Sequence, residues 1–194
     1  MSFATLRLAL VPVAAALGFS AVDPRPYALD PTQSEITFLA VSRLDDAHGS
    51  FGAFTADVAF DPDTVANSTV RIVIQPASIT TGIDRRDDHL RSCSFFCVDS
   101  FPQILFQSQK VTRVGPDRYN VGGTLTIRGI TRPVTIPTRM ISIEGTSAKF
   151  NGEFDMDRRD FGLGYSSVMN PIKDTVHVVF NFALYDAAPQ PRAQ

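Results

Sequence analysis

Three residues with the chemistry of metal ligands stand at helical spacing, because His89, Cys93 and Cys97 follow one another at intervals of four. On a continuous helix such side chains project from nearly one face. Imidazole and thiolate bind zinc and softer transition metals, but these sites normally need a fourth ligand. The other histidines, His48 and His177, lie in distant segments. We therefore assign no metal site, and a redox or haem- or metal-associated factor using this helix face stays as the alternative function.

The two cysteines have two further interpretations. A Cys93–Cys97 disulfide is favoured in an oxidising compartment, and one helical turn places the two α-carbons about 6 Å apart, near the wide end of disulfide geometry. Alternatively, two unpaired thiols pack as small apolar side chains. The sequence leaves both interpretations open.

Charges of both signs surround these residues, and Arg85, Arg86, Asp87, Asp88 and Arg91 could cradle a diphosphate or quinone head group. Because the two signs are mixed so closely, their net field on an anion is small, and pairing with one another is the favoured interpretation. The candidate residues for a mouth or head-group site are Arg86, His89 and Arg91.

Motifs for catalysis are missing from the sequence. The segment Gly49-Ser50-Phe51-Gly52 lacks the Gly-x-Ser-x-Gly spacing of a nucleophile elbow. Glycine-rich phosphate loops and zinc-protease motifs are also missing. We predict no catalytic residue and no enzyme activity.

The cysteines and charges belong to one helix-compatible segment, 78–102. Asp84 is the expected N-cap, acidic residues suit the first helical turn, and Phe101-Pro102 should stop the helix. The sequence predicts a short helix over 85–96, which is either a cover for a cavity or a plain surface connection.

The rest of the chain alternates apolar and polar residues, which predicts half-buried strands. The alternating segments are EITFLAV, FGAFTADVAF, STVRIVI, PQILFQSQKV, RYNVGGTLTI, RPVTIPTRMISI, AKFNGEFDM and VHVVFNFAL. Turn signals between them favour an antiparallel meander, and closing the meander removes its two exposed edges. We predict an all-β protein, an eight-stranded antiparallel β-barrel with one short helix covering or flanking its mouth.

A barrel of about eight strands is either filled by side chains or holds one slender ligand. The chain has 15 phenylalanines and no tryptophan, and these rings must fill a core or line an apolar cavity. Alternation gives the phase of a strand, but both kinds of interior fit it. The candidate lining residues are Phe38, Phe54, Ile72, Ile74, Phe106, Leu125, Ile127, Phe180 and Phe182.

Composition excludes one class of partner. The 194 residues carry a formal net charge of −2 and only three lysines, so no basic stripe for nucleic acid is present. About 170 residues beyond the leader bury enough surface to need no metal or disulfide. We therefore expect a single domain and no cofactor other than a bound lipid or quinone.

The first 20 residues have the pattern of a secretory signal peptide, with Arg7 before an apolar run and small residues near Ser20. The run is too short to span a hydrocarbon core of roughly 30 Å comfortably. We expect a signal peptide over 1–20, a barrel domain over 21–186 and a disordered tail over 187–194. The protein is then periplasmic or secreted, with no stable membrane anchor after cleavage.

Five landmarks in sequence order resemble the YceI-like family of secreted lipid-binding proteins. They are Tyr27-x-Leu29-Asp30 with Ser34-x-Ile36-x-Phe38; Gly49-x-Phe51-x-x-Phe54; Ser78-Ile79-x-Thr81-Gly82 with Arg86-Asp87-x-His89-Leu90-Arg91-Ser92; Tyr119-x-Val121-x-Gly123-x-Leu125-Thr126-Ile127; and Arg158-x-Asp160-Phe161-Gly162. The chain departs from the family pattern at Arg43, Ser94 and Cys97.

The resemblance implies a lipocalin-like barrel that binds a long apolar amphiphile, a polyisoprenoid or an isoprenoid quinone, in the periplasm. Its implied role is transport, storage or sequestration, and it is compatible with a homodimer. A filled barrel that serves only as a protein-interaction module is a third interpretation.

Overall fold

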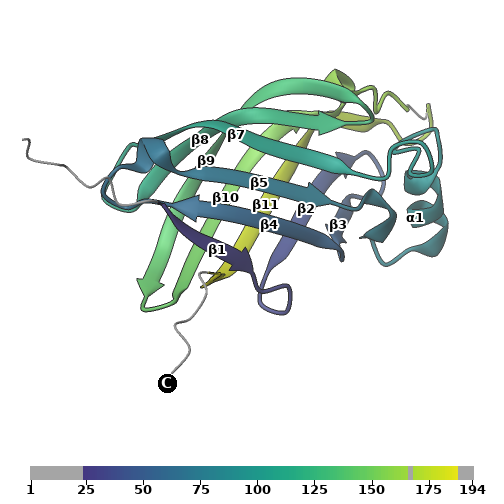
Figure 1. Cartoon of the computed structure of the whole chain (residues 1–194). Coiled ribbons are helices and arrows are strands. Elements are labelled where there is room, and N and C mark those ends of the chain that lie inside the picture. Colours follow the sequence, from purple (N-terminus) through teal and green to yellow (C-terminus); the bar gives the residue numbers. More distant parts are fainter. Residues whose placement is uncertain (1–23, 166–167, 188–194) are drawn as a thin grey trace, which may run out of the picture.

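Alternation along the strands places one apolar row of each strand inside a barrel, with a helix at one end (Figure 1). The computed structural model describes residues 24–165 and 168–187. The expected signal peptide, 1–20, lies outside these ranges, as do the tail residues from 188 onward. The strands are β1 (Arg25–Leu29), β2 (Glu35–Ser42), β3 (Ala47–Phe51), β4 (Phe54–Phe60), β5 (Thr69–Ile74), β6 (Ile79–Thr80), β7 (Ile104–Arg113), β8 (Arg118–Ile127), β9 (Ile130–Glu144), β10 (Ser147–Asp157) and β11 (Ile172–Asp186). The helices are α1 (Asp84–Arg91) and the 3-10 turns η1 (Val65–Asn67), η2 (Pro76–Ser78) and η3 (Arg158–Phe161).

Eight strands close the barrel in the order β1-β4-β5-β7-β8-β9-β10-β11, and β1 pairs back onto β11. Every pairing in this ring is antiparallel. The predicted eight-stranded antiparallel barrel is therefore confirmed. Closure satisfies the edge groups of β1 and β11, which an open sheet would leave unpaired.

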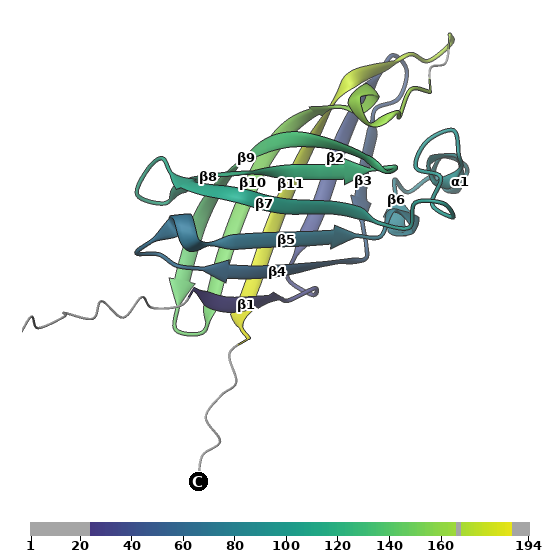
Figure 2. The same ribbon diagram turned by 45° about the horizontal axis from the view of Figure 1, so that its top comes forward.

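The last strand is long enough to have two partners on one side. Leu184 of β11 pairs with Leu29 of β1, whereas Phe180 pairs with Ile36 of β2. Beyond β2 the sheet continues through β3 to β6, at the end where α1 lies (Figure 2). These three strands therefore lengthen the barrel wall beside the helix.

The strand prediction missed β1, β6 and all of β3 except Phe51, the first residue of the predicted segment FGAFTADVAF. The proline in β1 and the two-residue length of β6 weaken the alternating pattern of each strand. FGAFTADVAF is divided at 52–53, where Ala53 O accepts a backbone bond from Gln75 outside the strand ladders.

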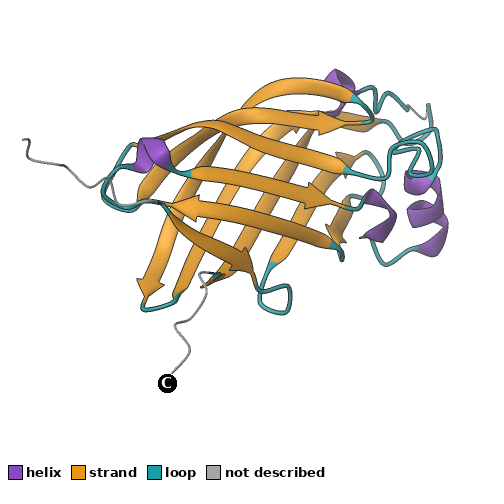
Figure 3. Cartoon of the chain, viewed as in Figure 1, coloured by secondary structure: helices purple, strands orange, loops and turns teal. Residues whose placement is uncertain are grey.

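The segment around η1 lies at the end of the barrel opposite α1 (Figure 3). Asp61 Oδ1 accepts hydrogen bonds from the backbone N–H groups of Asp63 at 2.9 Å and Thr64 at 2.8 Å. Val65 packs against the buried core. The interior therefore has one end beside η1 and one end beside α1.

The helix is shorter than predicted, because α1 ends at Arg91 rather than Phe96. Ser92 is extended, with ψ of 167°, and its N–H closes the last turn on Asp88 and His89. Cys97 has a φ of 49°, which is incompatible with a continuing helix. Asp84 is not the N-cap as expected: Ile83 occupies that position and makes no side-chain cap bond. Among the described residues, none of the helices has the length and apolar character to cross a membrane.

Candidate ligand cavity

A cavity of about 980 Å³ occupies the barrel at the α1 end. Its size is at the upper end of the range found for small-molecule sites, about 300 to 1,000 Å³. Nearly all of its strand-derived lining is apolar, because it consists of the inward rows of the strands. The apolar lining from the strands is Ile36, Phe38, Ala40, Ala47, Phe51, Ile74, Ile79, Ile104, Leu125, Ile127, Phe154, Met156, Ile172, Val176 and Val178.

A smaller chamber of about 110 Å³ continues the cavity toward the η1 end. The two share the lining residues Ile36, Ile74, Leu125, Phe154 and Val178. On β11 the lining runs from Ile172 beside α1 to Leu184 at the far end. At about 3.3 Å per residue and a strand tilt near 40°, this corresponds to a tunnel of roughly 30 Å.

In the structure, the strands point inward the same alternate residues that the sequence pattern predicted. Of the nine candidate lining residues, all but Phe54 line the cavity or the deep chamber. The ring of Phe54 packs against Phe182, with 5.9 Å between the ring centroids. Contact between these nine candidate residues and a ligand stays a prediction.

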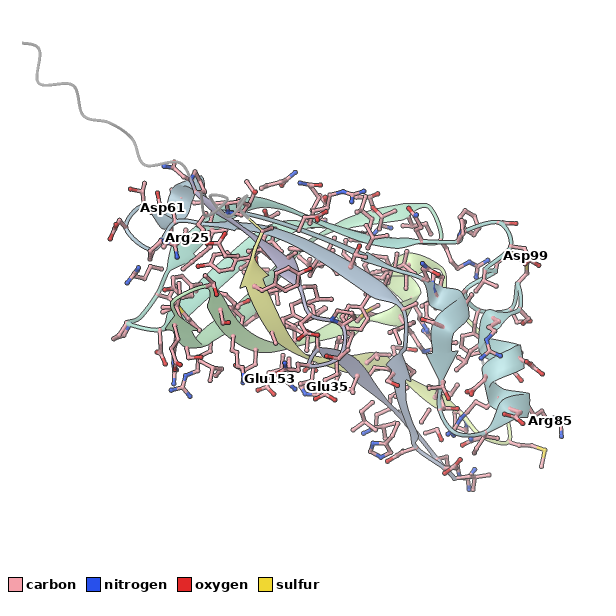
Figure 4. All side chains as sticks on the ribbon, turned by 60° about the horizontal axis from the view of Figure 1, so that its bottom comes forward. Arg25, Glu35, Asp61, Arg85, Asp99 and Glu153 are labelled. Carbon is pink, nitrogen blue, oxygen red and sulfur yellow. A yellow bond between two sulfur atoms is a disulfide. The ribbon has the colours of Figure 1, made fainter. Side chains whose placement is uncertain are left out.

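The mouth is formed by α1 together with the turn between β2 and β3 and the segment after η3. Arg85, Arg86, His89 and Leu90 of α1 line the cavity. Figure 4 shows Arg85 at this end of the molecule and Asp61 at the other. The polar side chains of the cavity are thus gathered at its mouth.

Arg86 and Arg91 differ in their relation to the cavity. Arg86 lines the mouth, where Nη1 pairs with Asp45 at 2.9 Å and Nε donates to Thr81 Oγ1 at 2.8 Å. Arg91 is not among the lining side chains: Nη2 donates to Ile79 O at 2.8 Å and Nε to Ala77 O at 3.0 Å. The head-group interpretation of Arg91 is therefore corrected, because its guanidinium holds η2 and β6 against the helix.

His89 sits among aromatic rings at the mouth. Its ring makes edge contacts with Tyr165 and Phe95, at centroid distances of 4.5 Å and 5.2 Å. The histidine is half-buried and lines the cavity. His89 therefore lies at the cavity mouth, and its contact with a head group stays a prediction.

The side chain of Asp87 points away from the cavity and anchors the start of the helix. Its buried carboxylate accepts bonds from Thr81 N at 2.8 Å, Thr81 Oγ1 at 2.5 Å and Thr80 Oγ1 at 3.2 Å. Burial acts to raise the pKa of Asp87, but these hydrogen bonds and the charge of Arg91 outweigh it and hold the pKa below the usual 3.8. The carboxylate therefore stays ionised while tying α1 to the Thr80–Thr81 segment.

Cys93 and Cys97 are joined by a disulfide, with their α-carbons 3.8 Å apart. The separation is shorter than the 6 Å expected from a helical turn because the helix has already ended. Both thiols are therefore occupied, and the face expected from His89, Cys93 and Cys97 does not form. Across the described ranges, no group of three or more His, Cys, Asp or Glu side chains is placed to hold a metal ion.

The sequence did not reveal the role of Arg158, which is 3% exposed. Its guanidinium donates to the carbonyls of Leu163, Tyr165, Ile172 and Lys173 and pairs with Asp174 at 3.0 Å. These acceptors lie on both sides of the segment at the cavity mouth. The Arg158-x-Asp160-Phe161-Gly162 landmark singled out Arg158 in the sequence. It did not indicate which groups Arg158 would bind.

Comparisons with known proteins agree over most of the chain. The model of the YceI-like domain matches residues 27–184. A UPF0312 protein of Yersinia pestis is 32% identical over 139 residues, covering 69% of this chain and 71% of its own. A UPF0312 protein of Vibrio campbellii is 28% identical over 135 residues, covering 67% and 71%.

Solved structures share the fold. The crystal structure of Burkholderia cenocepacia BcnA has a TM-score of 0.75 at 27% identity, covering 80% of this chain and 98% of its own. A polyisoprenoid binding domain from Saccharophagus degradans has a TM-score of 0.68 at 18% identity, covering 82% and 98%.

Proposed function

The chain belongs to the YceI-like family, and from this premise we propose that it is a periplasmic or secreted binding protein that holds a long apolar amphiphile in its barrel. The ligand is a polyisoprenoid or an isoprenoid quinone, held for transport, storage or sequestration. The observation that carries the proposal is the apolar tunnel, whose main cavity of about 980 Å³ has its charged side chains gathered toward the mouth. A filled barrel would lack this space.

Apolar contact alone supplies enough binding free energy for such a ligand. Burial of one methylene is worth about 0.8 kcal/mol, so a five-carbon isoprene unit contributes about 4 kcal/mol before the cost of ordering the chain. A few units therefore suffice for tight binding. The proposal accordingly includes no catalytic residue.

Two further observations support the ligand class and the compartment. The Saccharophagus degradans domain with the same fold is a polyisoprenoid binding domain. The Cys93–Cys97 disulfide is typical of proteins that work in an oxidising compartment. It also occupies both thiols that the alternative metal function would use as ligands.

Purification from the native host, followed by solvent extraction and native mass spectrometry, tests the proposal. We expect a co-purifying isoprenoid or quinone, and the delipidated protein should bind the prenol hexaprenol. Ala40→Phe should weaken this binding because Ala40 lines the cavity. Val41→Phe adds the same ring one residue further along β2, on the opposite face, and is the matched control. Empty protein that also fails to bind hexaprenol would overturn the proposal.

A further inference from the structure

Five large apolar side chains are exposed around the cavity mouth, and we call Leu44, Ile83, Tyr165, Val168 and Met169 the mouth collar. Leu44 is 71% exposed, Val168 97% and Met169 81%. Ile83 and Tyr165 are exposed as well, and both line the cavity. Single exposed apolar side chains are ordinary on a protein surface, whereas a group of them around an opening marks an interaction site.

The mouth collar is assembled from three segments that are far apart in the sequence. Leu44 lies in the β2–β3 turn, Ile83 directly precedes α1, and the other three residues follow η3. The backbone N–H of Leu44 donates to Asn170 Oδ1 at 2.9 Å, and the ring of Tyr165 contacts His89 of α1. These contacts hold the three segments together at the α1 end of the barrel (Figure 2).

The rest of the described surface exposes fewer large apolar side chains. The remaining four lie in the β7–β8 turn, in β9 and in β11: Val114, Ile141, Ile143 and Tyr185. None of these four lines the cavity or the deep chamber. The exposed apolar side chains are therefore concentrated where the tunnel opens.

The charges beside the mouth collar are balanced. The segments 43–46 and 83–86 together carry three basic and three acidic side chains: Arg43, Arg85, Arg86, Asp45, Asp46 and Asp84. Two of them, Arg86 and Asp45, pair with each other. A strongly charged partner surface would gain little from this arrangement, whereas burial of the mouth collar needs only an apolar phase.

A lipid bilayer is the apolar phase that suits this position. A long prenol hardly leaves a bilayer as a free molecule, because every methylene favours an apolar phase over water. A barrel that takes up such a ligand gains from bringing its opening against the bilayer. Projecting side chains at the tips of loops suit the fluid boundary between headgroups and acyl chains, whereas a protein interface normally has a closely packed core.

We propose that the mouth collar docks the barrel on a lipid bilayer, so that the amphiphile passes between membrane and cavity without crossing water. Leu44, Val168 and Met169 enter the boundary between headgroups and acyl chains, and the mouth faces the membrane. Docking is reversible because few apolar side chains insert, and it depends little on salt because the neighbouring charges balance. The proposal rests on the proposed function for the ligand, but docking itself is measurable without one.

Flotation of the delipidated protein with ligand-free vesicles of phosphatidylethanolamine and phosphatidylglycerol tests docking. The wild type should float with the vesicles at both low and high salt. The triple variant Leu44→Ser/Val168→Ser/Met169→Ser should bind the vesicles at least about 10-fold more weakly, which corresponds to about 1.4 kcal/mol. None of these three side chains lines the cavity, so the variant should bind hexaprenol in vesicle-free solution as the wild type does.

The matched control is the triple variant Val114→Ser/Ile141→Ser/Ile143→Ser. It also replaces three exposed apolar side chains by serine, but away from the mouth. It should float as the wild type does.

Uptake of hexaprenol from vesicles tests the consequence of docking. Vesicles that contain hexaprenol are mixed with delipidated protein and removed by flotation, and the prenol left with the protein is measured over time. Uptake by the mouth-collar variant should be about 10-fold slower than uptake by the wild type, in proportion to the weaker docking.

The outcomes separate the two proposals. A wild type that does not float overturns docking, whether or not it binds hexaprenol in solution. Equal flotation of the wild type and the mouth-collar variant also overturns it. Uptake that needs the mouth collar with native membranes, but does not occur from protein-free vesicles, overturns it in favour of a protein partner. A wild type that floats but does not bind hexaprenol in solution overturns the proposed function and leaves docking supported.

Discussion

Arg86 and Asp45 form an ion pair at the cavity mouth, with 2.9 Å between Nη1 and Oδ2. Arg86 belongs to α1, whereas Asp45 lies in the turn between β2 and β3, and both side chains line the cavity. The pair therefore ties the helix to the barrel where a ligand must pass.

Arg86→Ala should accelerate release of hexaprenol several-fold, because the helix loses its tie to the β2–β3 turn. The pair is partly exposed, so the free energy of unfolding should fall by no more than about 1 kcal/mol. Stopped-flow displacement measures the release rate. Asp88→Asn is the control, since it breaks the exposed Asp88–Arg91 pair within α1. Equal release rates in both variants would contradict a role for the mouth pair.

Arg158→Met should lower the free energy of unfolding by about 3 to 5 kcal/mol, because it leaves carbonyl groups and Asp174 without their buried partner. Chemical denaturation measures this change. Arg159 also pairs with Asp174, at 2.8 Å, but its side chain is 60% exposed. Arg159→Met should therefore cost about 1 kcal/mol or less. A similar cost for both variants would disprove the anchoring role of Arg158.

Asp87 should make stability sensitive to acid. Its pKa is lowered in the folded protein, so the unfolded chain binds the proton more readily and the free energy of unfolding rises with pH. The contribution is complete above the ordinary value of 3.8 and is lost as the pH falls through the lowered pKa.

Asp87→Asn should cost about 2 kcal/mol at neutral pH, because it weakens hydrogen bonds to a charged acceptor. The difference from the wild type should shrink below pH 3.8. Urea unfolding of the variant and the wild type at neutral pH and below pH 3.8 gives the comparison. Asp30 and Asp117, whose pKa values are also lowered, are present in both proteins, so their effects cancel in the difference. A difference that stays constant with pH would refute this assignment.

Gly152→Ala should destabilise the barrel by about 1 to 3 kcal/mol through overpacking. A Cβ atom there would lie 2.6 Å from the Phe180 ring and 2.5 Å from Pro137 O. Gly122→Ala is the control, because its Cβ would meet only ordinary contacts, the nearest at 3.6 Å. Thermal denaturation compares the two variants. Equal stability would show that the barrel wall beside Phe180 accommodates the added methyl group without cost.

Replacement of both cysteines by serine should lower the free energy of unfolding by about 2 kcal/mol, as expected for a short disulfide loop. Hexaprenol binding should persist, because neither cysteine lines the cavity. Reduction of the wild type should reproduce the loss, whereas the same reductant should leave the double variant unchanged. Loss of binding in the variant would instead assign the disulfide to the site.

The inward rows could be predicted because alternation is local. In VHVVFNFAL each second residue from Val176 to Leu184 lines the tunnel, as the pattern indicated. β1 escaped prediction because it is short, contains Pro26 and owes its place to pairing with β11. The end of α1 was placed too late because the chain turns at Ser92 and the next residues close the Cys93–Cys97 disulfide, which the sequence had left open.

The partners of the site residues could not be predicted. Arg158 binds backbone carbonyls, whose positions depend on the path of the mouth segment rather than on their side chains. Tyr119 occupies an alternating position in RYNVGGTLTI, so its inward phase could have been found.

The pairing of β1 with β11 joins the two ends of the described chain. β1 is the first strand of that chain and β11 the last, so the residues that pair are far apart in the sequence. Such a distant pairing raises contact order and slows folding. Until β11 docks, β1 and β10 keep free edges that can pair with other chains. The time needed to form this pairing therefore adds to the time during which a newly made molecule is exposed to aggregation.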